Sequence, residues 1–153
     1  MKTKIKKDWY GRLKSAEELH NDSKLWISEI DFIKDEIRFL NNLLSSNYIQ
    51  LLSANYIQLL DGGFNKKTTA LVKGISDQKI TANTLYKLIR DHNNKLSILI
   101  ESKSVTSNIH YFDTHKKLSI EIDNFLKKYR KTKKQIFQIL DNTMTKKGVK
   151  KLI

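Results

Sequence analysis

Proline and cysteine are both absent from this chain of 153 residues, and only five residues are glycine. Because proline is missing, no position forces a break inside a helix, and long helices are permitted throughout. Because cysteine is missing, disulfides and thiolate metal sites are excluded, and with them the small secreted domains that depend on disulfides. The length fits one domain with a sizeable hydrophobic core.

Long apolar runs are absent as well. The longest uninterrupted runs contain three apolar residues, as in Ile98–Ile100, so no segment is apolar enough to span a bilayer. The first seven residues are basic, but Asp8, Arg12 and Lys14 follow where a signal peptide needs apolar residues. We therefore expect a cytoplasmic protein.

The apolar residues that are present recur at intervals of three and four, which indicates helices rather than strands. The clearest series has heptad spacing after a first step of seven: Leu19, Trp26, Ile30, Ile33, Ile37, Leu40 and Leu44. Beside this first seam, Phe32, Phe39 and Leu43 form a second apolar strip. A helix with two adjacent apolar strips is expected to pack against two neighbours, which favours a bundle.

Turn and capping signals divide the chain into helices at about 15–61, 65–103 and 107–145, with basic tails at 1–14 and 146–153. Ser15 and Glu18 have the spacing of a capping box, and the glycines after Asp61 can close the first helix. Short turns between three long helices predict an all-α fold, an antiparallel up-down-up three-helix bundle with coiled-coil-like packing.

Residues 45–52 and 53–60 form a tandem repeat, SSNYIQLL followed by SANYIQLL, that is identical at seven of eight positions. Eight residues rotate a helix by ~80° beyond two full turns, so the two copies cannot present the same face in one straight helix. We favour a duplication that lengthens the first helix near its end. An exposed Tyr/Ile/Leu patch for a partner is the alternative.

No motif of a catalytic or nucleotide-binding class is present. The few glycines form neither a phosphate-binding loop nor a dinucleotide fingerprint, and the chain contains neither a serine nucleophile elbow nor a His-Glu-x-x-His motif. His110 and His115 are five residues apart and point to different helix faces. We expect a protein that is not an enzyme and uses no cofactor.

Three polar residues, Glu36, His92 and His115, lie within the helical apolar pattern. If the chain turns at Gly62 and near Thr106, their heights along the bundle agree within about 8 Å, which predicts one polar layer. We favour a structural role for this layer, in which hydrogen bonds between carboxylate and imidazole fix the helix register. Two alternatives stay open: a zinc or iron site made by the three groups, and no contact among them.

Charge is unevenly distributed along the chain, whose formal net charge is +13. Residues 1–14 carry +5, residues 15–115 carry −1 and residues 116–153 carry +9. A basic stripe in the third helix consists of Lys127, Arg130, Lys131 and Lys134. This stripe is suited to nucleic-acid phosphates. However, we expect Tyr129 and Phe137 in the core or at its flank, which leaves no aromatic platform among the cations.

Several further positions carry a resemblance: Trp26, Phe32–Glu36, Phe39, Leu40, His92, Asn93, His115, Lys116, Phe125, Leu126 and Tyr129. In these positions the chain resembles a group of small, uncharacterised bacterial helical proteins. The resemblance spans most of the chain and implies a three-helix coiled-coil fold in a bacterial cytoplasm, without implying a particular function. The tandem NYIQLL block departs from the spacing of that group and affects the placement of the first turn.

The sequence therefore predicts a non-enzymatic interaction or scaffold protein with a protein partner or self-association. A nucleic-acid-binding module that uses the third helix is the alternative, and a metal-binding protein with its site in the bundle core is a third interpretation. Contact with an anionic membrane surface is not favoured, and no small-molecule substrate is evident.

Overall fold

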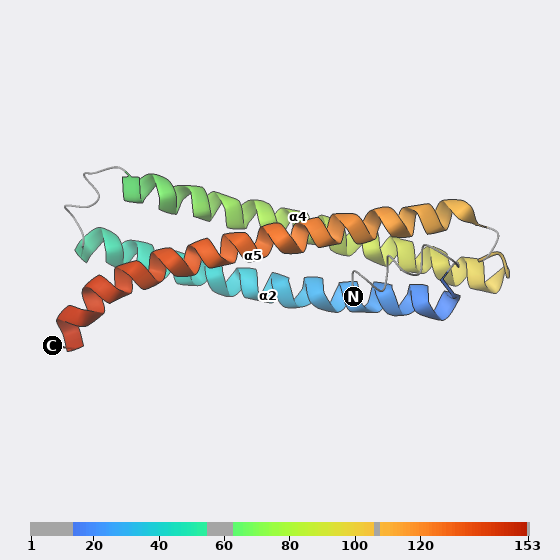
Figure 1. Cartoon of the computed structure of the whole chain (residues 1–153), viewed down its shortest axis with the longest axis horizontal. Helices are drawn as coiled ribbons and strands as arrows, with labels where there is room; N and C mark the ends of the chain where they lie inside the picture. The colour runs from blue at the N-terminus through green and yellow to red at the C-terminus, as the bar shows by residue number, and fades with distance from the viewer. Residues whose placement is uncertain (1–13, 55–62, 106–107, 153) are drawn as a thin grey trace. The chain divides into compact units, whose positions relative to one another are not determined.

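The structure is a computed structural model that describes the backbone of residues 14–54, 63–105 and 108–152 and the side chains of 14–45, 66–105 and 108–141. It contains three α-helices within these ranges, α2 (Ala16–Ala54), α4 (Gly63–Glu101) and α5 (Ile109–Leu152) (Figure 1). The helices pack against each other, which confirms the all-α prediction. No helix in the described ranges has the length and apolar character that crossing a membrane requires.

Local hydrogen bonds explain where the helices begin and end. At the start of α2, the Ser15 amide donates to Glu18 Oε1 and the Glu18 amide donates to Ser15 Oγ, so the predicted capping box is confirmed. At the start of α5, the Tyr111 amide donates to Asn108 Oδ1. After α4, the Ser104 amide donates to the Leu99 carbonyl while Lys103 has a φ of 57°, the geometry of a Schellman cap.

The helix bounds differ from the predicted ones at several points. The end predicted at residue 61, the first turn and most of the second copy of the tandem repeat lie outside the described residues. Residues 146–152 continue α5 and do not form a separate basic tail. Lys14, which we assigned to the N-terminal tail, is buried and bonds Asp22 of α2, because the ammonium group finds a carboxylate there.

The core follows the first predicted seam closely. All seven of its residues are buried, and they are joined in the core by residues of α4 and α5 such as Ile75, Ile89, Ile122 and Ile136. The second strip is wrong as a buried surface, since Phe32 is 64% exposed and Phe39 is 57% exposed. At ~100° per residue this strip lies roughly 120° around α2 from the middle of the seam, which places it outside the stripe that faces the other helices.

The helices form two compact units, each made from parts of all three. Unit 1 comprises residues 1–32 and 83–124, and unit 2 comprises residues 33–82 and 125–153. The core of unit 1 includes Leu19, Leu96, Tyr111 and Phe112. Unit 2 buries a mainly aliphatic set that includes Ile37, Leu40, Ile75, Ile136 and Leu140.

Candidate functional site

Two histidines meet inside unit 1, as predicted. His92 of α4 and His115 of α5 are both buried, and His92 Nε2 lies 2.8 Å from His115 Nδ1. Aromatic rings cover the pair: the Tyr111 ring stacks on His92 at 4.1 Å between centroids, and the Trp26 ring lies 4.6 Å from that of His115. The pair is therefore held in one geometry by packing on both sides.

The carboxylate partner of the histidines is Asp22. His115 Nε2 lies 2.9 Å from Asp22 Oδ2, and Lys14 Nζ lies 2.6 Å from the same oxygen. Because a carboxylate only accepts hydrogen bonds, His115 Nε2 donates to Asp22; in the neutral ring, His115 Nδ1 then accepts from His92 Nε2. This arrangement, which we call the polar chain, runs from His92 through His115 to Asp22 and Lys14.

Burial sets the protonation of the polar chain. It lowers the pKa of His92 to about 3, with further contributions from the neighbouring charges of His115 and Lys95. Burial acts against ionisation of Asp22, but hydrogen bonds from His115 and Lys14 outweigh it and hold the pKa of this carboxyl below its ordinary value. At neutral pH the polar chain therefore contains a neutral His92 and an ionised Asp22.

Glu36 does not belong to this arrangement, so the predicted layer is wrong in its carboxylate. In unit 2, the Tyr129 hydroxyl donates to Glu36 Oε1 at 2.5 Å and Lys133 Nζ donates to Glu36 Oε2 at 2.8 Å. Burial acts against ionisation of Glu36, but these two hydrogen bonds outweigh it and lower the pKa of its carboxyl. Burial, together with Glu36, raises the pKa of Tyr129, which stays a neutral donor.

The sequence does contain a signal for Asp22. The first seam makes a single step of seven residues, from Leu19 to Trp26, and the heptad position inside this step is Ser23, directly after Asp22. Asp22 therefore lies at the edge of the seam, where a partly buried carboxylate requires donors. Ser23, the next residue, is fully buried, and its hydroxyl has no hydrogen-bond partner within the described part of the chain.

The polar chain does not form a set of metal ligands. His115 uses both ring nitrogens in hydrogen bonds, one to His92 and one to Asp22. Among the residues that the structure describes, no group of three or more His, Asp or Glu side chains is placed to hold a metal ion. The contacts of the polar chain join α2, α4 and α5 within unit 1, which is the geometry of a buried structural network.

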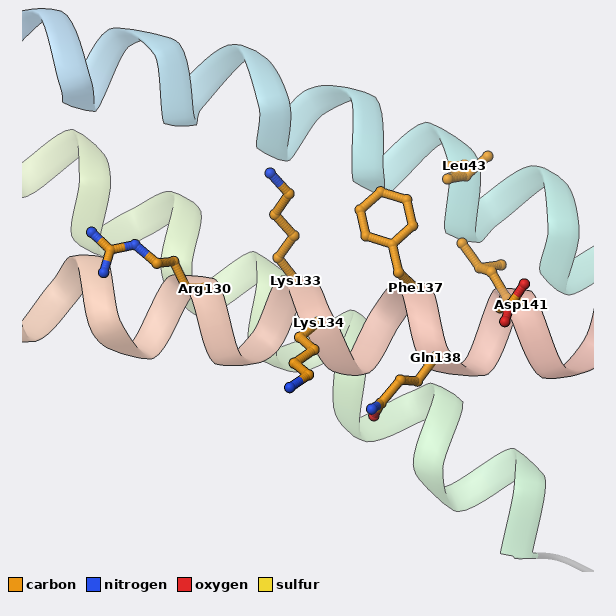
Figure 2. Close-up of a pocket in the computed structure, with 8 residues that line it drawn as sticks. Leu43, Arg130, Lys133, Lys134, Phe137, Gln138 and Asp141 are labelled. Carbon is orange, nitrogen blue, oxygen red and sulfur yellow. The ribbon is translucent and has the colours of Figure 1, made fainter.

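The basic stripe lies in unit 2. Lys127, Arg130, Lys131 and Lys134 are all exposed on α5. Arg130 and Lys134 also line a groove, whose other lining residues are Leu43, Lys133, Phe137, Gln138, Leu140 and Asp141. In Figure 2, Phe137 and Lys133 project from α5 toward α2 and Leu43, whereas Lys134 and Gln138 project from the other side of α5. We call this the unit 2 groove.

Phe137 is not a core residue but lies at the flank of the core, one of the two positions that we expected for it. Its side chain is 42% exposed, whereas that of Tyr129 is buried as predicted. The eight residues between them rotate a helix by ~80° beyond two full turns, which carries Phe137 away from the buried face on which Tyr129 lies. An aromatic ring therefore stands one helical turn beyond Lys133 and Lys134.

The two units also differ in total charge. Unit 2 contains 16 basic and 5 acidic residues, a net charge of +11, whereas unit 1 contains 13 basic and 11 acidic residues, a net charge of +2. Nearly all of the excess positive charge of the chain therefore belongs to the unit that carries the groove.

Comparisons of the chain with protein-family models, with curated proteins and with solved structures found no match.

Proposed function

We propose that the protein is a non-enzymatic helical-bundle interaction module, in the bacterial cytoplasm that the resemblance implies, and that unit 2 is its binding region. One observation carries this proposal: the unit 2 groove is lined by the apolar residues Leu43, Phe137 and Leu140 and by the cations Arg130 and Lys134. Apolar surface bordered by charged side chains is typical of interaction sites.

We further propose that α2, α4 and α5 run antiparallel, up-down-up, with coiled-coil-like packing. The composition of the units supports this direction: unit 1 combines the first part of α2 with the last part of α4 and the first part of α5. The bond between His20 Nδ1 and Asn93 Oδ1, at 3.1 Å, joins an early residue of α2 to a late residue of α4.

The proposed function is tested by affinity capture from the native host with two charge-reversed variants. One variant changes Lys127, Arg130, Lys131 and Lys134 of unit 2 to glutamate. Its matched control changes Lys24, Lys87, Arg90 and Lys117, exposed cations of unit 1, in the same way. We expect the same purified protein to bind the wild type and the control but not the unit 2 variant. Equal binding to both variants would contradict unit 2 as the binding region.

A nucleic acid is the second candidate partner, because all four predicted cations are exposed and Phe137 adds an exposed ring near them. Phosphate contacts release counterions, so this function predicts affinity for RNA or duplex DNA that falls steeply with salt concentration. Fluorescence anisotropy over a salt series measures this. Absence of binding at low salt, or binding unchanged by reversal of the four charges, would remove this candidate.

A further inference from the structure

The unit 2 groove combines two kinds of surface. Its apolar lining comes from both neighbouring helices, Leu43 of α2 and Phe137 and Leu140 of α5. Phe39 is 57% exposed one helical turn before Leu43 and extends the apolar surface along α2. Charged side chains stand beside these residues, positive at Arg130 and Lys134 and negative at Asp141.

We propose that the unit 2 groove docks an acidic amphipathic helix of a partner protein. This inference rests on the proposed function and names the chemistry of the partner. Apolar side chains at intervals of three and four residues would lie on Leu43 and Phe137, as in other complexes where a helix occupies a groove. Carboxylates on the flanks of the incoming helix would meet Arg130 and Lys134.

Charge argues for an acidic occupant and against a second copy of the chain. Unit 2 carries a net charge of +11, so two such units placed groove to groove would repel each other. An acidic helix is attracted by the same charge, which also accelerates its association at low ionic strength. The third cation of the groove, Lys133, is already bonded to Glu36, so the partner meets mainly Arg130 and Lys134.

The apolar lining argues for a helix over a nucleic acid. A single strand of nucleic acid needs several rings on which successive bases stack. Among the lining residues Phe137 is the one aromatic side chain, and Leu43, which lines the groove from α2, is aliphatic. Aliphatic side chains bind other aliphatic and aromatic side chains by removing surface from water, which an amphipathic helix provides.

The test uses the full chain and two synthetic acidic peptides of about five helical turns, ~18 residues. The first peptide carries Leu and Phe in one helical stripe with Glu on its flanks. The second peptide has the same composition in scrambled order, without a stripe. Fluorescence anisotropy measures their affinities, and single-stranded RNA and duplex DNA serve as further probes. We expect the striped peptide to bind at least about tenfold more tightly than the scrambled one.

Two pairs of variants locate the binding. Phe137→Ser removes the exposed ring of the groove, and Ile120→Ser, which changes a 53% exposed residue of α5 in unit 1, is its control. Reversal of Arg130 and Lys134 to glutamate changes groove residues, and reversal of Lys127 and Lys131 makes the same charge change outside it. We expect the first variant of each pair to bind the striped peptide about tenfold more weakly than the wild type does. The control variant of each pair should bind it with nearly the affinity of the wild type. Circular dichroism checks that each variant is folded.

The outcomes separate failure of this inference from failure of the proposed function. Equal affinity for both peptides, with equal effects of both charge reversals, would overturn the groove as the docking site but keep unit 2 as a basic binding region. No binding of any acidic probe at low salt would overturn both. Tightest binding to RNA or DNA would assign the surface to a nucleic acid. A dimer in light scattering that Phe137→Ser dissociates would place a second copy in the groove and likewise overturn the inference.

Discussion

Unit 1 and unit 2 are built from the same three helices, but they place their charged groups differently. Unit 1 buries an ammonium group and two imidazoles, those of Lys14, His92 and His115, and has a net charge of only +2. Unit 2 keeps the cations of its basic stripe exposed and has a net charge of +11. The difference teaches that unit 1 uses buried titratable groups to join its helices, whereas the cations of the basic stripe in unit 2 lie at the surface.

The largest predicted effect contrasts the carboxylates of the two units. Asp22→Ala leaves the buried Lys14 ammonium and the His115 ring without their acceptor, so we expect a loss of about 3 kcal/mol in the free energy of unfolding. Glu36→Ala in unit 2 should cost about 1–2 kcal/mol, because Lys133 is 35% exposed at its side chain and water can solvate it. Urea denaturation measures both values.

The variant Asp22→Asn controls for the loss of charge, since the amide oxygen can still accept from His115. We expect it to be less destabilising than Asp22→Ala. Equal costs for Asp22→Ala and Glu36→Ala would show that the two carboxylates are equally solvated, and would break the contrast between the units.

The next effect is the pH dependence of unit 1. Burial lowers the pKa of His92 to about 3, whereas the same ring in the unfolded chain titrates near 6.5. The unfolded state therefore binds more protons between these values, and stability falls as the pH drops below 6.5. The expected loss between pH 7 and pH 5 is about 2 kcal/mol from this group. Chemical denaturation over a pH series measures it.

His92→Phe supplies the control for this pH dependence. Phenylalanine keeps a ring against Tyr111 but does not titrate, so the stability of the variant should fall less between pH 7 and pH 5 than that of the wild type. Parallel pH profiles for the two proteins would show that His92 is accessible to protons in the folded state.

A smaller gain in stability is expected at the end of α4 in unit 1. Lys103 has a φ of 57°, in the left-handed region, where a side chain costs about 1 kcal/mol that glycine does not. Lys103→Gly should therefore raise the free energy of unfolding by about 1 kcal/mol, which thermal denaturation can detect. A lower melting temperature for this variant would show that the lysine side chain stabilises the cap by other contacts.

The opposite substitution should give the smallest gain, in unit 2. Gly74 lies inside α4, and a Cβ atom at this position would meet Thr132 Cγ2 at 3.9 Å, an ordinary van der Waals distance. Gly74→Ala should therefore stabilise the protein by about 0.5–1 kcal/mol through helix propensity. Destabilisation in urea denaturation would mean that α4 and α5 approach each other too closely for a methyl group.

The sequence was sufficient to predict the all-α fold and the main buried seam of the first helix. The heptad seam from Leu19 to Leu44 depends only on the helical period, and each of its residues is buried. The capping box of Ser15 and Glu18 depends on residues three apart, and both of its hydrogen bonds are formed. Such features follow from local geometry and need no knowledge of how the helices are paired.

Predicting the candidate site required knowing which residues of different helices lie opposite each other. That part of the prediction was partly wrong. The second turn, placed near Thr106, put His92 and His115 at similar heights, and the two rings do meet. The first turn was placed at Gly62, which matched His92 with Glu36. The bond between His20 and Asn93 instead brings the segment around Asp22, and not the one around Glu36, to the His92 segment.

Surface exposure could be predicted least. Phe32, Phe39 and Phe137 are apolar residues next to buried positions, and the sequence does not state how wide the buried stripe of each helix is. A residue that neighbours a seam can lie at the edge of the core or outside it. The unit 2 groove therefore emerged only from the structure, although its cations Arg130 and Lys134 were predicted as an interaction surface.

The central claim is that partners bind to the groove of unit 2. The most direct measurement is a map of amide chemical-shift changes in the full, isotope-labelled chain as the striped acidic peptide is added. We predict changes concentrated around Phe39 and Leu43 of α2 and around Arg130 to Asp141 of α5. Changes of similar size around Lys116 and Lys117 of unit 1, or no changes at all, would contradict the claim.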